Sequence, residues 1–209
     1  MTEELGLFPL ELVLLPTERI PLHIFEPRYR ELIRECLDEE REFGLVLDRG
    51  EETAPVGTRA GVVQVLQMLP DGRMNIVVEG RGRFRIVEPT GGRLFPTAAV
   101  DPVEDEDDPA EAEELERALA LFARLVTLTG AEVEAPEPAS PQLAFELAAR
   151  IDFGNELKQE LLELRSPRER LARLTELLER AAEAVELENE LRDRASRNGK
   201  VTPLRDLDD

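Results

Sequence analysis

Few side chains in this sequence could form a catalytic centre. Its 209 residues include one histidine, His23, one cysteine, Cys36, three serines and two lysines. A nucleophilic serine or thiol needs a base within hydrogen-bond reach. Ser140 and Ser166 each precede a proline, which is typical of helix N-caps and disfavours a Ser–Lys dyad. Cys36 lies among apolar residues at helical spacing, so a small buried thiol is favoured over a thiol–imidazole pair with His23.

Metal and nucleotide chemistry also lack their usual patterns. A lone histidine without a spare cysteine cannot anchor a zinc site. The Gly80-Arg81-Gly82-Arg83 stretch leads into an alternating strand and not a helix, so it fails the context of a dinucleotide-binding loop. The sequence contains no GxxxxGK[ST] motif, and the acidic stretch 101–108 lacks the spacing of an EF-hand. We therefore expect no cofactor, no metal and no enzymatic activity.

Three arginines are candidates for binding. Arg81, Arg83 and Arg85 alternate, which places them on one face of a strand, with Phe84 and Ile86 on the other. One interpretation is a stripe that binds RNA or acidic peptides. The other, favoured because surface charges usually pair or stay solvated, is that they meet the acidic half of the same chain.

The charge distribution bears on that choice. Residues 1–100 carry a net charge of -5 and residues 101–209 a net charge of -15, counted from 12 basic against 17 acidic and 14 basic against 29 acidic residues. Such a field repels phosphate backbones at long range. Nucleic acid is thus disfavoured as a partner.

The arginines would be positioned by a β-rich half. Pro9 and Pro16 border a first strand, which predicts an edge or bulged strand. Apolar residues from Tyr29 to Leu37 recur at helical spacing, which predicts a helix from Pro27 to about Phe43. β-Branched runs around Pro70-Asp71-Gly72 predict a hairpin. The expected strands are 6–15, 20–24, 45–48, 61–68, 74–79, 81–87 and 95–100, with an exposed loop at 49–58, and this number suits a small closed or half-open barrel.

The second half is helical in pattern after the acidic linker 101–108. Helix starts are predicted at Asp108-Pro109, Ser140-Pro141, Asn155 and Ser166-Pro167, the last with Glu169 completing a capping box, and Gly130 ends the first helix. The final helix would run from 166 to about 195, roughly 45 Å. Its coiled-coil-like seam of Leu171, Leu174, Leu178, Ala181 and Val185 shifts face near Leu187, so we expect its second half to project. The predicted domains are 1–104 and 108–195, followed by a mobile tail, 196–209.

Several motifs resemble those of one family in order and spacing. They are Phe8-Pro9-Leu10, Leu15-Pro16, the stretch PLHIFEPRY from Pro21, LPDGR from Leu69 and EGRGRFRI from Glu79. Together they resemble the LON domain, the PUA-like substrate-binding domain of Lon proteases. The resemblance implies an α+β fold, with a PUA-like small β pseudo-barrel and one helix followed by an α-helical bundle that ends in a long helix. At Thr17-Glu18-Arg19 the sequence departs from the small, glycine-containing turn common in the family, which puts contacts by this loop in doubt.

The resemblance also implies a function. The sequence given contains neither the ATPase nor the protease module that follows in Lon proteases, so we expect a non-catalytic, ATP-independent polypeptide-binding or adaptor module. Its partner would be an unfolded or degron-bearing polypeptide, and a protease or chaperone could dock on the projecting helix. An RNA-binding PUA-like protein that uses the three arginines is the alternative, and a small enzyme is a third class.

The predicted binding surface combines an apolar patch with charge, as peptide sites often do. Its residues are Leu22, Phe25, Arg28 and Tyr29, with Arg81, Arg83 and Arg85 nearby. The competing interpretation is that Phe25 and Tyr29 are core residues that join the helix to the barrel.

The expected location is the cytoplasm, without membrane association. No apolar run approaches the roughly 20 residues that cross a bilayer, and the N-terminus, MTEELG, is acidic where a signal peptide is basic. The client and the oligomeric state are not fixed by the sequence.

Overall fold

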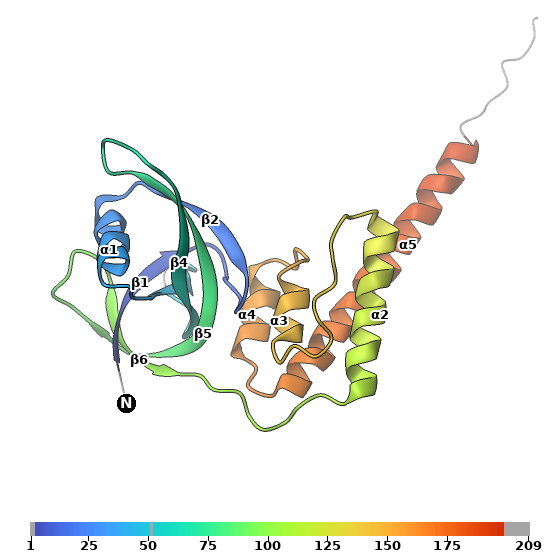
Figure 1. Cartoon of the computed structure of the whole chain (residues 1–209). Coiled ribbons are helices and arrows are strands. Elements are labelled where there is room, and N and C mark those ends of the chain that lie inside the picture. The colour runs from blue at the N-terminus through green and yellow to red at the C-terminus, as the bar shows by residue number, and fades with distance from the viewer. Residues whose placement is uncertain (1–2, 51, 199–209) are drawn as a thin grey trace, which may run out of the picture.

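A closed β barrel and a group of helices lie side by side in the structure, a computed structural model that describes residues 3–50 and 52–198 (Figure 1). The strands are β1 Glu3–Leu10, β2 Arg19–Ile24, β3 Phe43–Leu47, β4 Val56–Met68, β5 Met74–Thr90 and β6 Thr97–Pro102. The sheet order is β2-β5-β4-β3-β1-β6, and β5 also pairs with β6. That last pairing closes five strands into a barrel, and β2 is attached to β5 outside the ring. With six strands and five helices in the described residues, the expected α+β fold is confirmed.

The long strand β5 organises the barrel. It pairs with β2 through residues 74–79, with β4 through residues 74–85 and with β6 through residues 84–90. The sequence predicts two strands here, 74–79 and 81–87, and the structure has one continuous strand. Gly80 lies at the join, where a Cβ atom would stand 2.1 Å from the Leu15 carbonyl oxygen. Glycine is required because the loop before β2 crosses β5 at this point.

That crossing loop contains a strained residue. Thr17 has φ of 70°, the left-handed region that favours glycine. Its N–H donates to the Gly80 carbonyl (2.8 Å), and Gly80 N–H donates to the Glu18 carbonyl (2.9 Å). These two hydrogen bonds hold the threonine in the turn that ends at Arg19.

The sequence predicts the first strand as an edge or bulged strand over 6–15, but it ends at Leu10 and is not at the edge of the sheet. β1 lies between β3 and β6. It pairs with β6 through Glu3–Gly6 and with β3 through Leu7–Leu10. Pro9 is tolerated because its part of the strand has a partner on one side only.

Helix α1, Pro27–Asp38, buries the predicted stripe against the barrel, with Tyr29, Leu32, Ile33 and Cys36 inside. It ends five residues before Phe43. Glu40 adopts a positive φ of 52°, and Arg41 N–H donates to the Cys36 carbonyl (2.9 Å), which turns the chain into β3.

The helical lobe contains α2 Ala112–Thr129, α3 Leu143–Ala148, α4 Asn155–Glu163 and α5 Pro167–Asn198. Gly130 ends α2 with φ of 67°, as predicted. The predicted starts of α2 and α3 are early by a few residues. At α2 the Glu114 carboxylate accepts from Glu111 N–H (2.7 Å), so a glutamate capping box replaces the predicted Asp108 cap.

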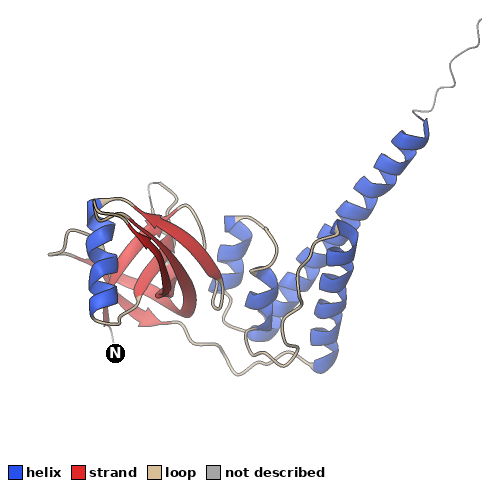
Figure 2. Cartoon of the chain, turned by 45° about the horizontal axis from the view of Figure 1, so that its top comes forward, coloured by secondary structure: helices blue, strands red, loops and turns tan. Residues whose placement is uncertain are grey.

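Helices α2 and α5 pack in parallel. Arg117 pairs with Glu179 and Arg124 pairs with Glu186, so both numbers rise together. Leu187 and Leu191 are exposed although they lie level with the last turns of α2, and the C-terminal end of α5 extends past α2 and projects from the lobe (Figure 2). The predicted tail begins inside α5 with residues 196–198, and residues 199–209 lie outside the described residues.

The two lobes share one apolar core. Leu15, Ala54 and Val56 of the barrel pack in the same cluster as Phe145 and Leu162 of the helical lobe. The prediction that 49–58 is an exposed loop is therefore wrong for Ala54 and for Val56, which begins β4. None of the helices in the described ranges is long and apolar enough to cross a membrane.

Candidate functional site

The structure divides the predicted binding residues between two places. Leu22 lies on β2, Phe25 directly follows it and Arg28 is in the first turn of α1; β2 pairs with the end of β5 that forms the hairpin with β4. Arg83 lies between the two lobes. The predicted single surface is thus two separate sites, which we call the hairpin face and the arginine joint.

The hairpin face consists of apolar side chains that solvent reaches: Leu22, Phe25, Val65, Leu66 and Met68. Phe25 is 59% exposed, Leu66 is 53% exposed and Met68 is 61% exposed. The strand register brings them together, because Ile24 and Met68 both pair with Met74, while Leu22 and Val65 both pair with Ile76. A bulge between Val65 and Gln67 turns Leu66 outward.

A row of polar groups, His23, Asn75 and Gln67, alternates with these residues along the strands and points to the other side of the sheet. His23 Nδ1 and Asn75 Oδ1 are 2.6 Å apart, and Asn75 Nδ2 donates to Gln67 Oε1 (3.2 Å). Because Asn75 Nδ2 donates to Gln67, its Oδ1 accepts from His23, which therefore carries its hydrogen on Nδ1. The imidazole stacks on Phe25 with 5.9 Å between ring centroids. These groups and Leu22 and Leu66 line a shallow groove.

Tyr29 belongs to the core beneath the face. It is 4% exposed and stacks on Phe8 with centroids 4.0 Å apart. The Arg28 guanidinium lies 4.5 Å from the ring centroid and donates to Glu26 (2.9 Å). Burial raises the pKa of the Tyr29 hydroxyl. The core interpretation therefore describes Tyr29, whereas Phe25 is on the surface.

The three arginines of β5 have three different environments. Arg81 is half exposed and pairs with Glu42 (3.0 Å), a residue of its own lobe. Arg85 is exposed, and no ion pair involves it within the described residues. Arg83 is 6% exposed, because the helical lobe covers the outer face of β5 at this position. Arg83 pairs with Thr58 and Arg85 with Val56, so these two share a face, but the β bulge between Thr58 and Ala60 turns Arg81 to the opposite side of the sheet. The prediction of one face for all three arginines is therefore wrong for Arg81.

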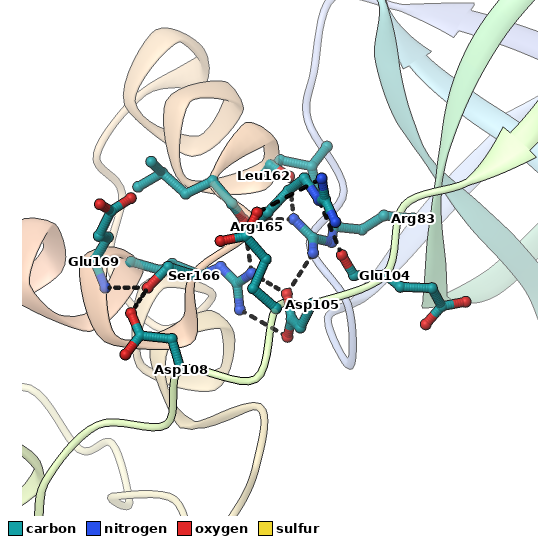
Figure 3. Close-up of polar contacts among 11 residues, drawn as sticks. Arg83, Glu104, Asp105, Asp108, Leu162, Arg165, Ser166 and Glu169 are labelled. Atoms are coloured by element: carbon teal, nitrogen blue, oxygen red, sulfur yellow. Dashed lines mark hydrogen bonds and ion pairs between the residues drawn. The ribbon is translucent and has the colours of Figure 1, made fainter.

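The arginine joint consists of Arg83, Asp105, Phe145 and Arg170. Arg83 Nη1 donates to the carbonyls of Leu162 and Leu164, both at 2.7 Å. The Asp105 carboxylate accepts from both Arg83 and Arg170 (Figure 3). Asp105 comes from the linker between the lobes, and the two arginines come from opposite lobes. One carboxylate thus ties three segments together.

Phe145 of α3 completes the joint. Its ring centroid lies 4.1 Å from the Arg170 guanidinium carbon and 5.6 Å from that of Arg83. Burial lowers the pKa of Arg83 to about 10, so the guanidinium stays charged at neutral pH. Arg170 Nη2 also donates to the Leu164 carbonyl (2.7 Å). Two buried cations therefore share one carboxylate, carbonyls and an aromatic face, which compensates for their desolvation.

Neither place assembles a catalytic group. Cys36 is buried, and this burial raises the pKa of its thiol to about 11, so it is protonated at neutral pH. His23 is bonded to an amide and not to a nucleophile. In the described part of the chain no group of three or more His, Cys, Asp or Glu side chains is arranged to hold a metal ion.

Sequence reasoning missed Asp105 and Arg170 as members of the joint. Arg170 precedes Leu174 by four residues and Leu178 by eight, so it lies on the buried stripe of α5. A charged residue on such a stripe is a signal for a buried ion pair. Asp105 stands within an acidic run and has no comparable signal.

The fold, a six-stranded sheet in which five strands close into a barrel, joined to helices of which the last is long, is that of Lon N-terminal domains. A Lon N-terminal domain protein from Xanthomonas campestris superposes with a TM-score of 0.67 at 27% identity, covering 82% of this chain and 96% of that one. The N-terminal domain of the Mycobacterium avium complex Lon protease superposes with a TM-score of 0.64 at 19% identity, covering 85% and 98%. The second likeness shows the fold alone.

Residues 4–180 match the ATP-dependent protease La (LON) substrate-binding domain, and the chain belongs to this family. It is similar to Lon protease of Anaeromyxobacter dehalogenans and to Lon protease 2 of Myxococcus xanthus, each 32% identical over 196 residues and 86% of this chain. The chain spans 23% and 24% of those two proteins. The suspected family is therefore confirmed, and the matched part of the relatives is their substrate-binding domain.

Proposed function

We propose that the chain binds unfolded polypeptide through the hairpin face, without catalysis and without ATP. The observation that carries the proposal is the exposure of Phe25, Leu66 and Met68, which gather where β2 ends beside the β4–β5 hairpin. Large apolar side chains that gather on a surface mark an interaction site more often than a solvated one. The family's substrate-binding name supports the same class of ligand.

The chemistry of the face suits varied clients. Methionine is flexible and polarisable, so Met68 can adapt to side chains of different shape. The His23, Asn75 and Gln67 row, which lines the groove together with Leu66, offers donors and acceptors to the main chain of an extended segment.

RNA binding gains no support from the site. Arg83 is enclosed by the joint, and Arg81 is already paired with Glu42. The formal net charge of the chain is -20. A protease or chaperone that receives the client remains part of the proposal, with the projecting end of α5 as its docking element.

The test measures binding of a fluorescently labelled, permanently unfolded model protein by anisotropy. The double variant Phe25→Ser/Met68→Ser removes the two most exposed apolar side chains of the face, and we expect an affinity loss of about tenfold or more. Leu94→Ser/Val87→Ser is the matched control, because Leu94 (71% exposed) and Val87 lie outside the face. Equal losses in both variants would refute a specific role of the hairpin face.

A further inference from the structure

An apolar cavity lies in the helical lobe, away from the hairpin face. It is bounded by the linker after β6, the loop before α3 and the first turn of α5, and its volume is about 380 Å³. Ligand pockets in proteins begin at roughly 300 Å³. Its walls include Pro109, Pro138, Pro141, Pro167, Leu115 and Leu171, so we call it the proline cavity.

The walls of the proline cavity are held in place. Glu106 N–H donates to the Arg165 carbonyl (2.9 Å), and Arg168 N–H donates to the Asp108 carbonyl (3.1 Å), which fastens the linker to the start of α5. The Ser166 hydroxyl donates to Asp108 (2.6 Å) and accepts from Glu169 N–H (3.0 Å) (Figure 3). Proline removes backbone freedom from the remaining wall. A ligand would therefore enter a cavity that is already formed, at little cost in ordering.

The rim of the cavity is acidic. Asp105, Glu106 and Asp107 line it. Asp105 is neutralised by the arginine joint, and Glu106 pairs with Arg165 at 3.5 Å. No ion pair is formed by Asp107 among the residues that the structure describes. An apolar cavity beside an uncompensated carboxylate, in a half of the chain with a net charge of -15, repels anions and attracts cations.

Two wall side chains have polar atoms without a hydrogen-bond partner in the described part of the chain. They are the donor Nε of Arg170 and the acceptor Oε1 of Gln142. A peptide group carries one acceptor and one donor, so it has the atom that each of them lacks. Unsatisfied buried polar atoms cost free energy until they are paired.

We infer that the proline cavity is a second polypeptide site, which takes an apolar side chain of a segment that carries lysine or arginine beside it. The apolar walls receive the side chain, and Asp107 attracts the neighbouring cation. The inference needs only the cavity and its charge, so it stands apart from the function proposed for the hairpin face.

The experiment uses the full chain and three short labelled peptides: one with a single leucine flanked by lysines, one with serine in place of that leucine, and one with glutamates in place of the lysines. Affinity is measured by anisotropy at low and at moderate salt. We expect the first peptide to bind about tenfold more tightly than either of the others, with a preference that weakens as salt screens the rim.

Two variants locate the site. Ala139→Trp places a large side chain in the cavity from an exposed loop position, and Asp107→Lys reverses the uncompensated charge. Glu132→Lys is the matched control, because it makes the same charge change in the exposed loop just after the far end of α2. We expect Ala139→Trp and Asp107→Lys each to weaken binding of the lysine-flanked peptide about tenfold, with Glu132→Lys close to the parent.

The outcomes separate the two sites. Equal binding of the leucine and serine peptides, or equal effects of Asp107→Lys and Glu132→Lys, would overturn the inference. If Phe25→Ser/Met68→Ser abolishes binding of the lysine-flanked peptide and Ala139→Trp leaves it unchanged, the cavity is not the site, and the function proposed for the hairpin face is unaffected.

Discussion

The hairpin face and the arginine joint use opposite chemistry at opposite degrees of burial. The face exposes Phe25 and Met68, side chains that usually form a core, whereas the joint buries Arg83 and Arg170, side chains that usually stay in water. The free-energy cost of burying these charges is offset in the joint, because each guanidinium donates to the Asp105 carboxylate and to at least one main-chain carbonyl oxygen. Exposure at the face has no such compensation within the described chain. The joint therefore stabilises the contact between the two lobes. The face can be stabilised further only when a partner covers its apolar side chains.

The largest effect on stability is expected from Asp105→Ala. This change leaves two buried guanidiniums without their shared carboxylate, and removing one partner of a buried pair costs about 3–5 kcal/mol. Urea unfolding followed by circular dichroism measures the loss. The neighbouring Asp107→Ala, exposed and without an ion pair among the described residues, should change stability by less than about 0.5 kcal/mol. Similar values for the two variants would mean that Asp105 does not bridge the lobes.

The next largest effect on stability is expected to differ between Arg83 and Arg81, two arginines that the sequence pattern does not distinguish. Arg83→Gln removes the donors to the Leu162 and Leu164 carbonyls and should cost about 2–3 kcal/mol. Arg81→Gln breaks only an exposed pair with Glu42 and should cost under about 1 kcal/mol. The measurement is the difference between the two urea midpoints. If Arg81→Gln costs as much as Arg83→Gln, burial is not what distinguishes the two positions.

A smaller effect is expected where the joint meets the start of α5. Ser166→Ala removes the hydroxyl that accepts from Glu169 N–H and should cost about 1 kcal/mol, the usual value of an N-cap. Thermal unfolding detects this loss. Ser140→Ala is the comparison. The Ser140 hydroxyl donates to the Glu146 carboxylate (2.6 Å) and accepts from Gln142 N–H (3.2 Å), but within the described residues it accepts from no N–H inside a helix, so its loss should matter less. A reversed order of the two losses would contradict the assignment of Ser166 as the cap.

The smallest effect on stability is expected at the hairpin face. Phe25→Ser exchanges an exposed ring for a small polar group and should shift the free energy of unfolding by less than about 0.5 kcal/mol. Tyr29→Ala, four residues away and 4% exposed, should cost about 3–5 kcal/mol. Both values come from urea titrations of the purified variants. A large loss of stability in Phe25→Ser would mean that Phe25 is a core residue, which would remove the basis of the binding proposal.

Local signals predicted most of the fold. The stripe of Tyr29, Leu32, Ile33 and Cys36 predicted the buried side of α1, and Pro70-Asp71-Gly72 predicted the hairpin. Gly130 predicted the end of α2. Each of these depends on residues within a few positions of one another, where side-chain periodicity and backbone preference act directly.

What only the tertiary structure decided is which side chains the second lobe covers. Arg83 is buried because two carbonyls 79 and 81 residues later and a carboxylate 22 residues later converge on it, while Arg81 and Arg85, two residues to either side, stay outside. Phe25 and Tyr29 differ for the same kind of reason. Tyr29 is buried because α1 packs it on Phe8, and Phe25, just before α1, has no such cover. Alternation along one strand or helix fixes the direction in which a side chain points. Whether another segment lies in that direction depends on contacts between residues far apart in the chain, which no local pattern records.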